Sequence, residues 1–178
     1  MNLPSVGVDS FTGVLELCSH LAGLGHRRVV YLSGSPLAWQ SRERWRAVQT
    51  ACIFGIDAVS VECDGTIDTA YATTEEVLTH DPTTIVCFND LAAIRAISRL
   101  RDLGLSVPND ISVTGFDDIV LARHFLPTLT TICSPKAELG DRSWALMKAA
   151  LDREEMETPP LLPADVVLRD STGPAKAD

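Results

Sequence analysis

The chain has 178 residues, of which 46% are hydrophobic and 22% are charged, and its formal net charge is -9. This length and apolar content allow a buried core in one domain or in two small lobes. The negative charge repels a phosphate backbone, and the longest basic run is the pair Arg27 and Arg28, so we do not expect the chain to bind DNA by itself.

The helices and strands can be predicted in chain order from the spacing of apolar residues. Val6 to Val8 is compatible with a very short strand, after which Asp9 or Ser10 can cap a helix that Gly25 ends. The apolar face of this helix consists of Val14, Leu17, Cys18 and Leu21. The next buried strand is expected at residues 28–33, where β-branched and apolar residues follow one another.

Strands and helices then alternate along the chain. We predict helices at 41–54, 69–79 and 90–103, and strands at 58–62, 84–88 and 111–116. This alternation indicates an α/β fold with a parallel sheet and helices on both of its faces. Beyond residue 118 we predict an extended segment at 126–132, a helix at 136–151, a strand at 164–168 and a disordered tail at 171–178.

Five cysteines are spread through otherwise apolar segments, without a Cys-x-x-Cys pair or a nearby histidine set. They are Cys18, Cys52, Cys63, Cys87 and Cys133. This pattern indicates buried thiols in a reducing compartment, and neither a metal nor a cofactor is expected. Because we find no signal peptide and no apolar run long enough to span a bilayer, we expect a cytoplasmic protein with no membrane partner.

Two predicted strands end in pairs of polar residues. Asp117 and Asp118 follow one strand, and Asn89 and Asp90 follow another. Ligands of open parallel sheets bind beyond the carboxyl ends of the strands, so Asp117 is interpreted as an acceptor for a ligand hydroxyl or amine. In each pair the second residue is expected to cap a helix, which leaves Asn89 to face the crevice with a donor and an acceptor.

Arg44 lies near the start of a predicted helix that follows a long loop, and Trp39 lies in that loop, just before the helix. Taken alone, Arg44 is more often a surface residue in such a place, although its guanidinium has the geometry to bind a carboxylate or adjacent hydroxyls. Trp39 can offer an apolar face to a sugar ring or fill the core.

One segment suggests an enzyme. Residues 61–69 resemble the Asp-x-Asp-Gly-Thr signature of haloacid-dehalogenase-type phosphatases, but Glu62 occupies the position of the nucleophile. A carboxylate that is one methylene longer misplaces the attacking oxygen for in-line phosphoryl transfer. We therefore keep a phosphatase as a remote alternative and expect no enzymatic activity.

Several segments in one collinear order resemble the effector-binding part of the LacI/GalR family of sugar-responsive transcriptional regulators. They are residues 20–34, 41–44, 88–92, 103–118, 127–131 and 169–172. The resemblance runs from about Val6 to Thr172. Together the segments are far more specific than any one of them.

The resemblance implies a periplasmic-binding-protein-like fold, in which two α/β lobes close on an effector. By motif position it implies that Arg44 grips effector hydroxyls and that Asn89 and Asp117 contact the effector. Ala47 and Val48 depart from the family, which usually has Gly and an aromatic residue there.

The same resemblance implies one complete lobe plus part of a second. Residues 1–27 are expected to be a remnant of the N-terminal lobe and 28–125 the C-terminal lobe. Residues 126–170 are expected to cross over and return to the N-terminal lobe, with the tail at 171–178. The chain begins where the family has already passed its helix-turn-helix, so DNA binding is expected only through a domain absent here. Incomplete packing of the first lobe, together with the family's dimer-forming surface, predicts a homodimer.

The leading hypothesis is the effector-sensing and dimerisation region of a transcriptional regulator, which binds a sugar or a similar small polar metabolite between two lobes. The alternative within the same fold is the periplasmic sugar-binding component of a transporter. The missing signal peptide and the five unpaired cysteines disfavour it.

Overall fold

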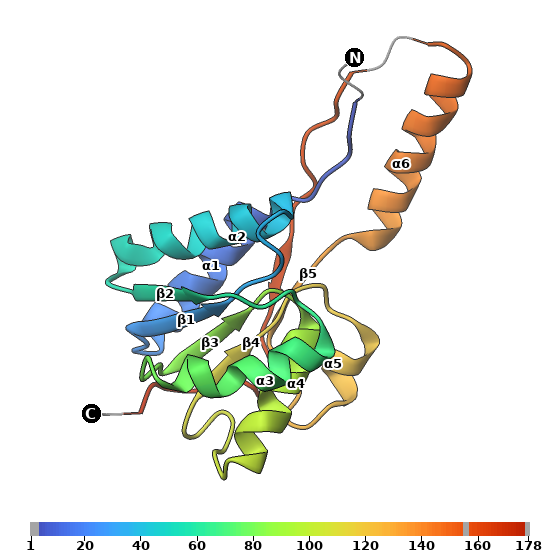
Figure 1. Ribbon diagram of the computed structural model, residues 1–178. Coiled ribbons are helices and arrows are strands. Elements are labelled where there is room, and N and C mark those ends of the chain that lie inside the picture. Colours follow the sequence, from blue (N-terminus) through green and yellow to red (C-terminus); the bar gives the residue numbers. More distant parts are fainter. Residues whose placement is uncertain (1–3, 155–156, 177–178) are drawn as a thin grey trace.

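The computed structural model describes residues 4–154 and 157–176. Its centre is a four-stranded parallel sheet in the order β2-β1-β3-β4 (Figure 1). The strands are β1 (Arg28–Leu32), β2 (Asp57–Val61), β3 (Thr84–Cys87) and β4 (Ser112–Thr114). Because all four strands run in one direction, their carboxyl ends lie at one edge of the sheet.

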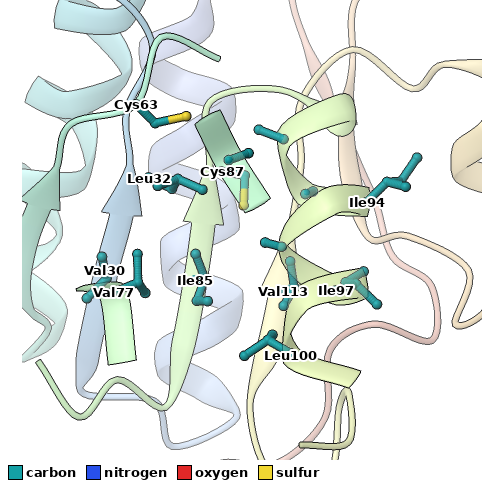
Figure 2. Close-up of a cluster of buried hydrophobic side chains, with 14 of the residues drawn as sticks. Val30, Leu32, Cys63, Val77, Ile85, Cys87, Ile94, Ile97, Leu100 and Val113 are labelled. Atoms are coloured by element: carbon teal, nitrogen blue, oxygen red, sulfur yellow. The ribbon is translucent and has the colours of Figure 1, made fainter. Parts of the chain in front are cut away.

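Helices cover both faces of this sheet, as the sequence predicted. On one face lie α1 (Ser10–Gly23) and α2 (Trp39–Thr50), and on the other lie α3 (Ile67–Leu78) and α4 (Asp90–Asp102) (Figure 1). Alternate residues of β1 divide between the two cores, since Tyr31 packs with α1 and α2 while Val30 and Leu32 pack with α3 and α4 (Figure 2). The expected fold class is confirmed.

α1 begins and ends as its sequence predicts. The Asp9 carboxylate accepts a hydrogen bond from the Thr12 amide at 3.0 Å, and Gly25 follows the helix at a φ of +92°. The segment before it forms only a single bridge, between Val8 and Leu162, instead of the short strand that was expected.

The expectation that residues 1–27 are a remnant of the other lobe does not hold for α1, residues 10–23, which packs on the central sheet. The apolar face of α1 is buried in the same core as Tyr31 and Val86 of the central sheet. α1 is therefore part of the complete lobe. The sequence could not show this because the face of a helix does not specify which sheet it covers.

Cysteine burial is also only partly as expected. Cys18, Cys63 and Cys87 are buried, and burial raises the pKa of the Cys18 thiol to about 12. Cys133 is half-buried, and Cys52 is exposed on the short 3-10 helix η1 (Ala51–Phe54). The prediction of a buried thiol is thus wrong for Cys52, because its turn lies at the surface.

After β4 the chain leaves the central sheet and builds a second sheet of two strands. It forms α5 (Val120–His124), β5 (Thr131–Cys133), α6 (Lys136–Leu151) and β6 (Asp165–Val167), and β5 pairs with β6 in antiparallel orientation. α6 lies apart from the central sheet, and none of its residues is buried (Figure 1). Within the described ranges, no helix is long and apolar enough to cross a membrane.

The C-terminal tail contradicts the expectation of disorder over residues 171–176. Ser171 is fully buried and donates to the Val113 carbonyl at 2.6 Å, and the Ala175 amide donates to the Leu24 carbonyl at 2.9 Å. These contacts join the tail to β4 and to the end of α1. The last two positions of the expected tail, 177 and 178, lie outside the described residues.

Candidate functional site

A cavity of about 590 Å³ opens at the carboxyl edge of the central sheet. It lies between the strand ends and the segments that lead toward α6. Three of the four predicted site residues line it, namely Trp39, Arg44 and Asp117. The cavity thus lies where the strand-end rule places a ligand.

Arg44 is buried at the back of this cavity, between two aromatic rings. Its guanidinium carbon lies 3.5 Å from the centre of the Phe116 ring and 4.7 Å from that of Phe88, and its Nη1 donates to the Phe88 carbonyl. Burial lowers the pKa of Arg44, and the negative charge of Asp117 opposes this shift. Its Nε is buried and has no hydrogen-bond partner among the described residues. Arg44 is therefore a fixed cation whose buried Nε–H is still available as a donor.

Asp117 lies in the loop that follows β4, and its backbone is anchored on both sides. Its amide donates to the Ile132 carbonyl at 2.8 Å, and Lys136 Nζ donates to its carbonyl oxygen. Burial raises the pKa of its carboxyl, while the charges of Arg44 and Lys136 oppose the shift. The carboxylate itself makes no hydrogen bond within residues 4–154 and 157–176. It is free to accept one from a ligand.

Asn89 is placed differently from the other three predicted residues. Its Oδ1 accepts from the Ala92 amide at 2.8 Å, and its Nδ2 donates to the Gly65 carbonyl at 3.0 Å. Asn89 is thus the N-cap of α4, and it is not among the residues that line the cavity. The expectation that Asp90 caps this helix is wrong, and a contact between Asn89 and an effector stays a prediction.

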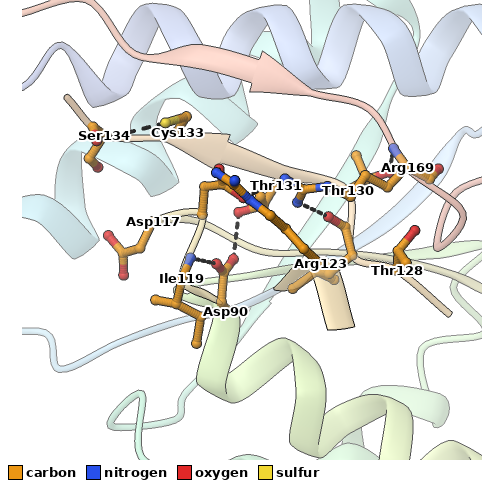
Figure 3. Close-up of polar contacts among 12 residues, drawn as sticks. Asp90, Asp117, Ile119, Arg123, Thr128, Thr130, Thr131, Cys133, Ser134 and Arg169 are labelled. Atoms are coloured by element: carbon orange, nitrogen blue, oxygen red, sulfur yellow. Dashed lines mark hydrogen bonds and ion pairs between the residues drawn. The ribbon is translucent and has the colours of Figure 1, made fainter. Parts of the chain in front are cut away.

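Asp90 instead joins three separate segments. It is fully buried, and its carboxylate accepts from the Ile119 amide at 2.8 Å and from Thr131 Oγ1 at 2.5 Å (Figure 3). Burial raises the pKa of Asp90 to about 6. The two hydrogen bonds oppose this shift, and the nearby charges of Asp117 and Asp118 add to it. This carboxyl therefore links the start of α4 to β5 and to the loop after β4.

Asp118 is not a helix cap either. α5 begins two residues later without a side-chain cap, and the Asp118 carboxylate pairs with Arg169 at 2.5 Å and with Arg123 at 2.7 Å. Burial raises the pKa of Asp118, but the hydrogen bonds and charges of both arginines outweigh it and bring the pKa below its ordinary value. Sequence reasoning missed this role because Arg169 lies 51 positions away.

Trp39 is the first residue of α2, and 45% of it is exposed at the cavity. Sequence reasoning missed four polar neighbours that also line the cavity. They are Ser5, Ser10, Gln40 and Ser134. They follow no motif and come from three separate segments, so only the folded chain brings them together.

The segment that resembled a phosphatase signature forms the end of β2, a loop and the first turn of α3. Asp64 accepts from the Thr66 amide at 2.8 Å and from Thr69 Oγ1, while Thr66 caps α3. Glu62 is exposed. Hydrogen bonds within the loop therefore satisfy the Asp64 carboxylate. In the part of the chain that the structure describes, no group of three or more His, Cys, Asp or Glu residues could hold a metal ion.

Comparison with known proteins agrees with the fold. Residues 18–172 match a family model described as a periplasmic binding protein-like domain. The chain is 35% identical over 159 residues to the transcriptional repressor PurR of Vibrio vulnificus, which covers 85% of this chain and 48% of PurR. It is 27% identical to the repressor CytR of Escherichia coli, with 97% of this chain and 52% of CytR covered. The chain thus spans about half the length of the curated relatives it matches.

Solved structures that resemble this chain are also transcriptional regulators of the LacI family. A LacI family transcriptional regulator from Enterococcus faecium with bound ribose superposes with a TM-score of 0.87 and 28% identity, over 97% of this chain and 66% of that one. A sugar-binding regulator of the LacI family from Escherichia coli, complexed with phosphate, gives a TM-score of 0.84 and 26% identity over 96% and 63% of the two chains. The relatives named above are transcriptional regulators. The chain belongs to the periplasmic binding protein-like domain family, and it is an effector-binding region of the LacI family of transcriptional regulators.

Proposed function

We propose that the cavity at the carboxyl edge of the sheet binds a sugar or a similar small polar metabolite, and that this binding is the signal sensed by a transcriptional regulator. One observation carries the proposal. Among the described residues, a buried arginine with an unpartnered Nε and a carboxylate without a hydrogen bond line the same cavity. Adjacent hydroxyl groups, which both donate and accept, satisfy such a pair.

The site residues have separate roles in this proposal. Arg44 donates to the ligand from a position fixed by Phe88 and Phe116, while Asp117 accepts from a hydroxyl or amine. Trp39 offers its ring as an apolar surface. Asn89 is an additional contact only if the ligand extends past the cavity lining. Ribose and cellobiose in solved neighbours support a sugar as the ligand class.

The remaining parts of the proposal concern the whole protein. We propose that it is cytoplasmic, that it is not an enzyme, and that it acts as a homodimer whose DNA contacts come from a region outside this chain. The named repressors support this proposal, and so do solved neighbours described as dimeric Lac repressor, at 26% identity.

Calorimetric titration of this chain with a panel of sugars and nucleosides tests the binding proposal. At least one panel member should bind the parent chain, and Asp117→Ala should weaken its affinity by about tenfold or more, since a hydrogen bond to a charged group is lost. Asp57→Ala is the matched control, because Asp57 is exposed at the opposite end of the strands. If Asp117→Ala binds as tightly as Asp57→Ala, the site assignment is wrong.

A further inference from the structure

The turn that carries Asp117 has an unfavourable backbone conformation. Asp117 has a φ of +112° and Asp118 a φ of +49°, and neither is a glycine. Non-glycine residues seldom adopt such angles, and the conformation persists only where surrounding contacts hold it. Some part of the fold must therefore fix this turn.

One side chain of the turn, Asp118, forms an almost fully buried ion pair with Arg169. The side chain of Asp118 is 3% exposed and that of Arg169 is 13% exposed. One guanidinium nitrogen of Arg169 donates to Asp118 at 2.5 Å, and the other donates to the Leu129 carbonyl at 2.7 Å. The forked guanidinium thus joins the turn to the chain that precedes β5.

Arg169 is itself anchored in the segment that follows β6. Its amide donates to Thr130 Oγ1 at 2.9 Å, and the same hydroxyl donates to the Arg169 carbonyl at 3.1 Å (Figure 3). The base of this side chain is therefore fixed by two hydrogen bonds. Arg169 therefore links the turn to the segment that follows β6.

The second partner of Asp118 offers a natural comparison. Arg123 lies 2.7 Å from the same carboxylate, but 62% of its side chain is exposed. Exposed ion pairs contribute little, because water and salt screen them and both side chains lose entropy. The two arginines have the same charge and the same partner but differ in burial.

We infer that Asp118, held by the buried Arg169, is a positioning residue that fixes the turn and thereby aims the Asp117 carboxylate into the cavity. The inference rests on the proposed function, because it assigns Asp118 a role in the site through Asp117. Neither Asp118 nor Arg169 lines the cavity. Their effect on a ligand is therefore indirect.

The first test needs no ligand. The pKa of the Asp117 carboxyl is measured by carbon NMR in the parent chain, in Arg169→Met and in Arg123→Met, with Asp117→Asn to assign the resonance. Loss of a nearby positive charge alone raises this pKa, whereas release of the turn lets the half-buried carboxylate move into water and lowers it toward an ordinary aspartate. Arg169→Met should lower the pKa of Asp117, and Arg123→Met should leave it unchanged or raise it slightly.

A rise in Arg169→Met, or equal values in the two variants, would overturn the inference. If Arg169→Met does not fold, Arg169→Lys replaces it. Lysine keeps the charge but cannot donate to Asp118 and Leu129 with one planar fork, so the pKa of Asp117 should still fall. An unchanged value in Arg169→Lys then contradicts the inference.

The second test uses the panel sugar or nucleoside that the parent chain binds. Arg169→Met should weaken its affinity by about tenfold, and Arg123→Met by less than about twofold. If Asp117→Ala has no effect on binding, the proposed function fails, yet the pKa test still decides whether Arg169 fixes the turn. The failures of the two proposals are therefore distinguishable.

Discussion

Arg44 lies between two aromatic rings, and this arrangement depends on the shape of its side chain as well as on its charge. A planar guanidinium can stack on Phe116 and Phe88 at the same time, and a lysine ammonium cannot. We expect Arg44→Lys to lower the free energy of unfolding by about 1–3 kcal/mol, measured by urea denaturation. Arg46 is an exposed arginine that lies over the ring of Phe11. Arg46→Lys should change the free energy of unfolding by less than about 0.5 kcal/mol. Equal losses in both variants would contradict the role given to the ring pair.

Asp90 predicts a dependence of stability on pH. Its pKa is about 6 in the folded chain, above the ordinary value of 3.8, so the folded state binds the proton more tightly than the unfolded state. The contribution of Asp90 to stability is therefore present below about pH 4 and is lost as the pH rises through about 6. Asparagine can replace both of its hydrogen bonds, by accepting from the Ile119 amide and donating to Thr131 Oγ1.

The comparison to make is between the parent chain and Asp90→Asn in urea between pH 4 and pH 7. As the pH rises from 4 to 7, the free energy of unfolding of the parent should fall by on the order of 1–3 kcal/mol relative to that of the variant. All other carboxyl groups titrate in both proteins, so the difference isolates Asp90. A constant difference would show that its pKa is not raised.

At the scale of elements, the segment after β6 is held to the sheet by a few buried polar contacts. Ser171 donates to the Val113 carbonyl and accepts from the Thr130 amide, and it is fully buried. Ser171→Ala leaves both groups without this partner, which should lower the free energy of unfolding by about 1–3 kcal/mol. Ser143→Ala, on the exposed surface of α6, removes one hydroxyl from a helix and should change it by less than about 0.5 kcal/mol. Similar values for the two variants would mean that the tail adds little to the fold.

Most of the helices and strands could be predicted because their signals are local. The apolar face of α1 and its Asp9 cap depend on residues within a few turns of one another. The roles of Asp90 and Asp118 could not be predicted, since their partners Thr131 and Arg169 lie 41 and 51 positions away. Any Asp or Asn before a helix looks like a cap in the sequence, and only the fold shows which one has another partner.

At the scale of the whole molecule, the same limit applies to the site and to the tail. The strand-end rule and the family motifs led to Arg44 and Asp117, which line one cavity, but not to the aromatic rings that hold Arg44. Residues 171–176 are held in a fixed conformation partly by a hydrogen bond between Ser171 and Val113, which lie 58 positions apart. Sequence patterns therefore identified candidate residues, and long-range packing decided how they are held.

Several large apolar side chains remain exposed, and they lie on more than one element. They include Val120, Leu126, Trp144 and Leu151, each more than half exposed. Monomeric proteins seldom expose much contiguous apolar surface, so we expect this chain to associate with a second copy. Light scattering at micromolar concentration should give about twice the mass of one chain. A strictly monomeric species would contradict the proposed homodimer.

The central claim is that a small polar ligand binds between Arg44 and Asp117, and NMR of these two side chains tests it most directly. When the panel ligand is added, the largest changes should occur at the Arg44 Nε resonance and at the Asp117 carboxyl, because both gain a hydrogen bond. Asp57, at the far end of the strands, should not respond. Saturable binding that leaves Arg44 and Asp117 unchanged and shifts resonances elsewhere would contradict the account.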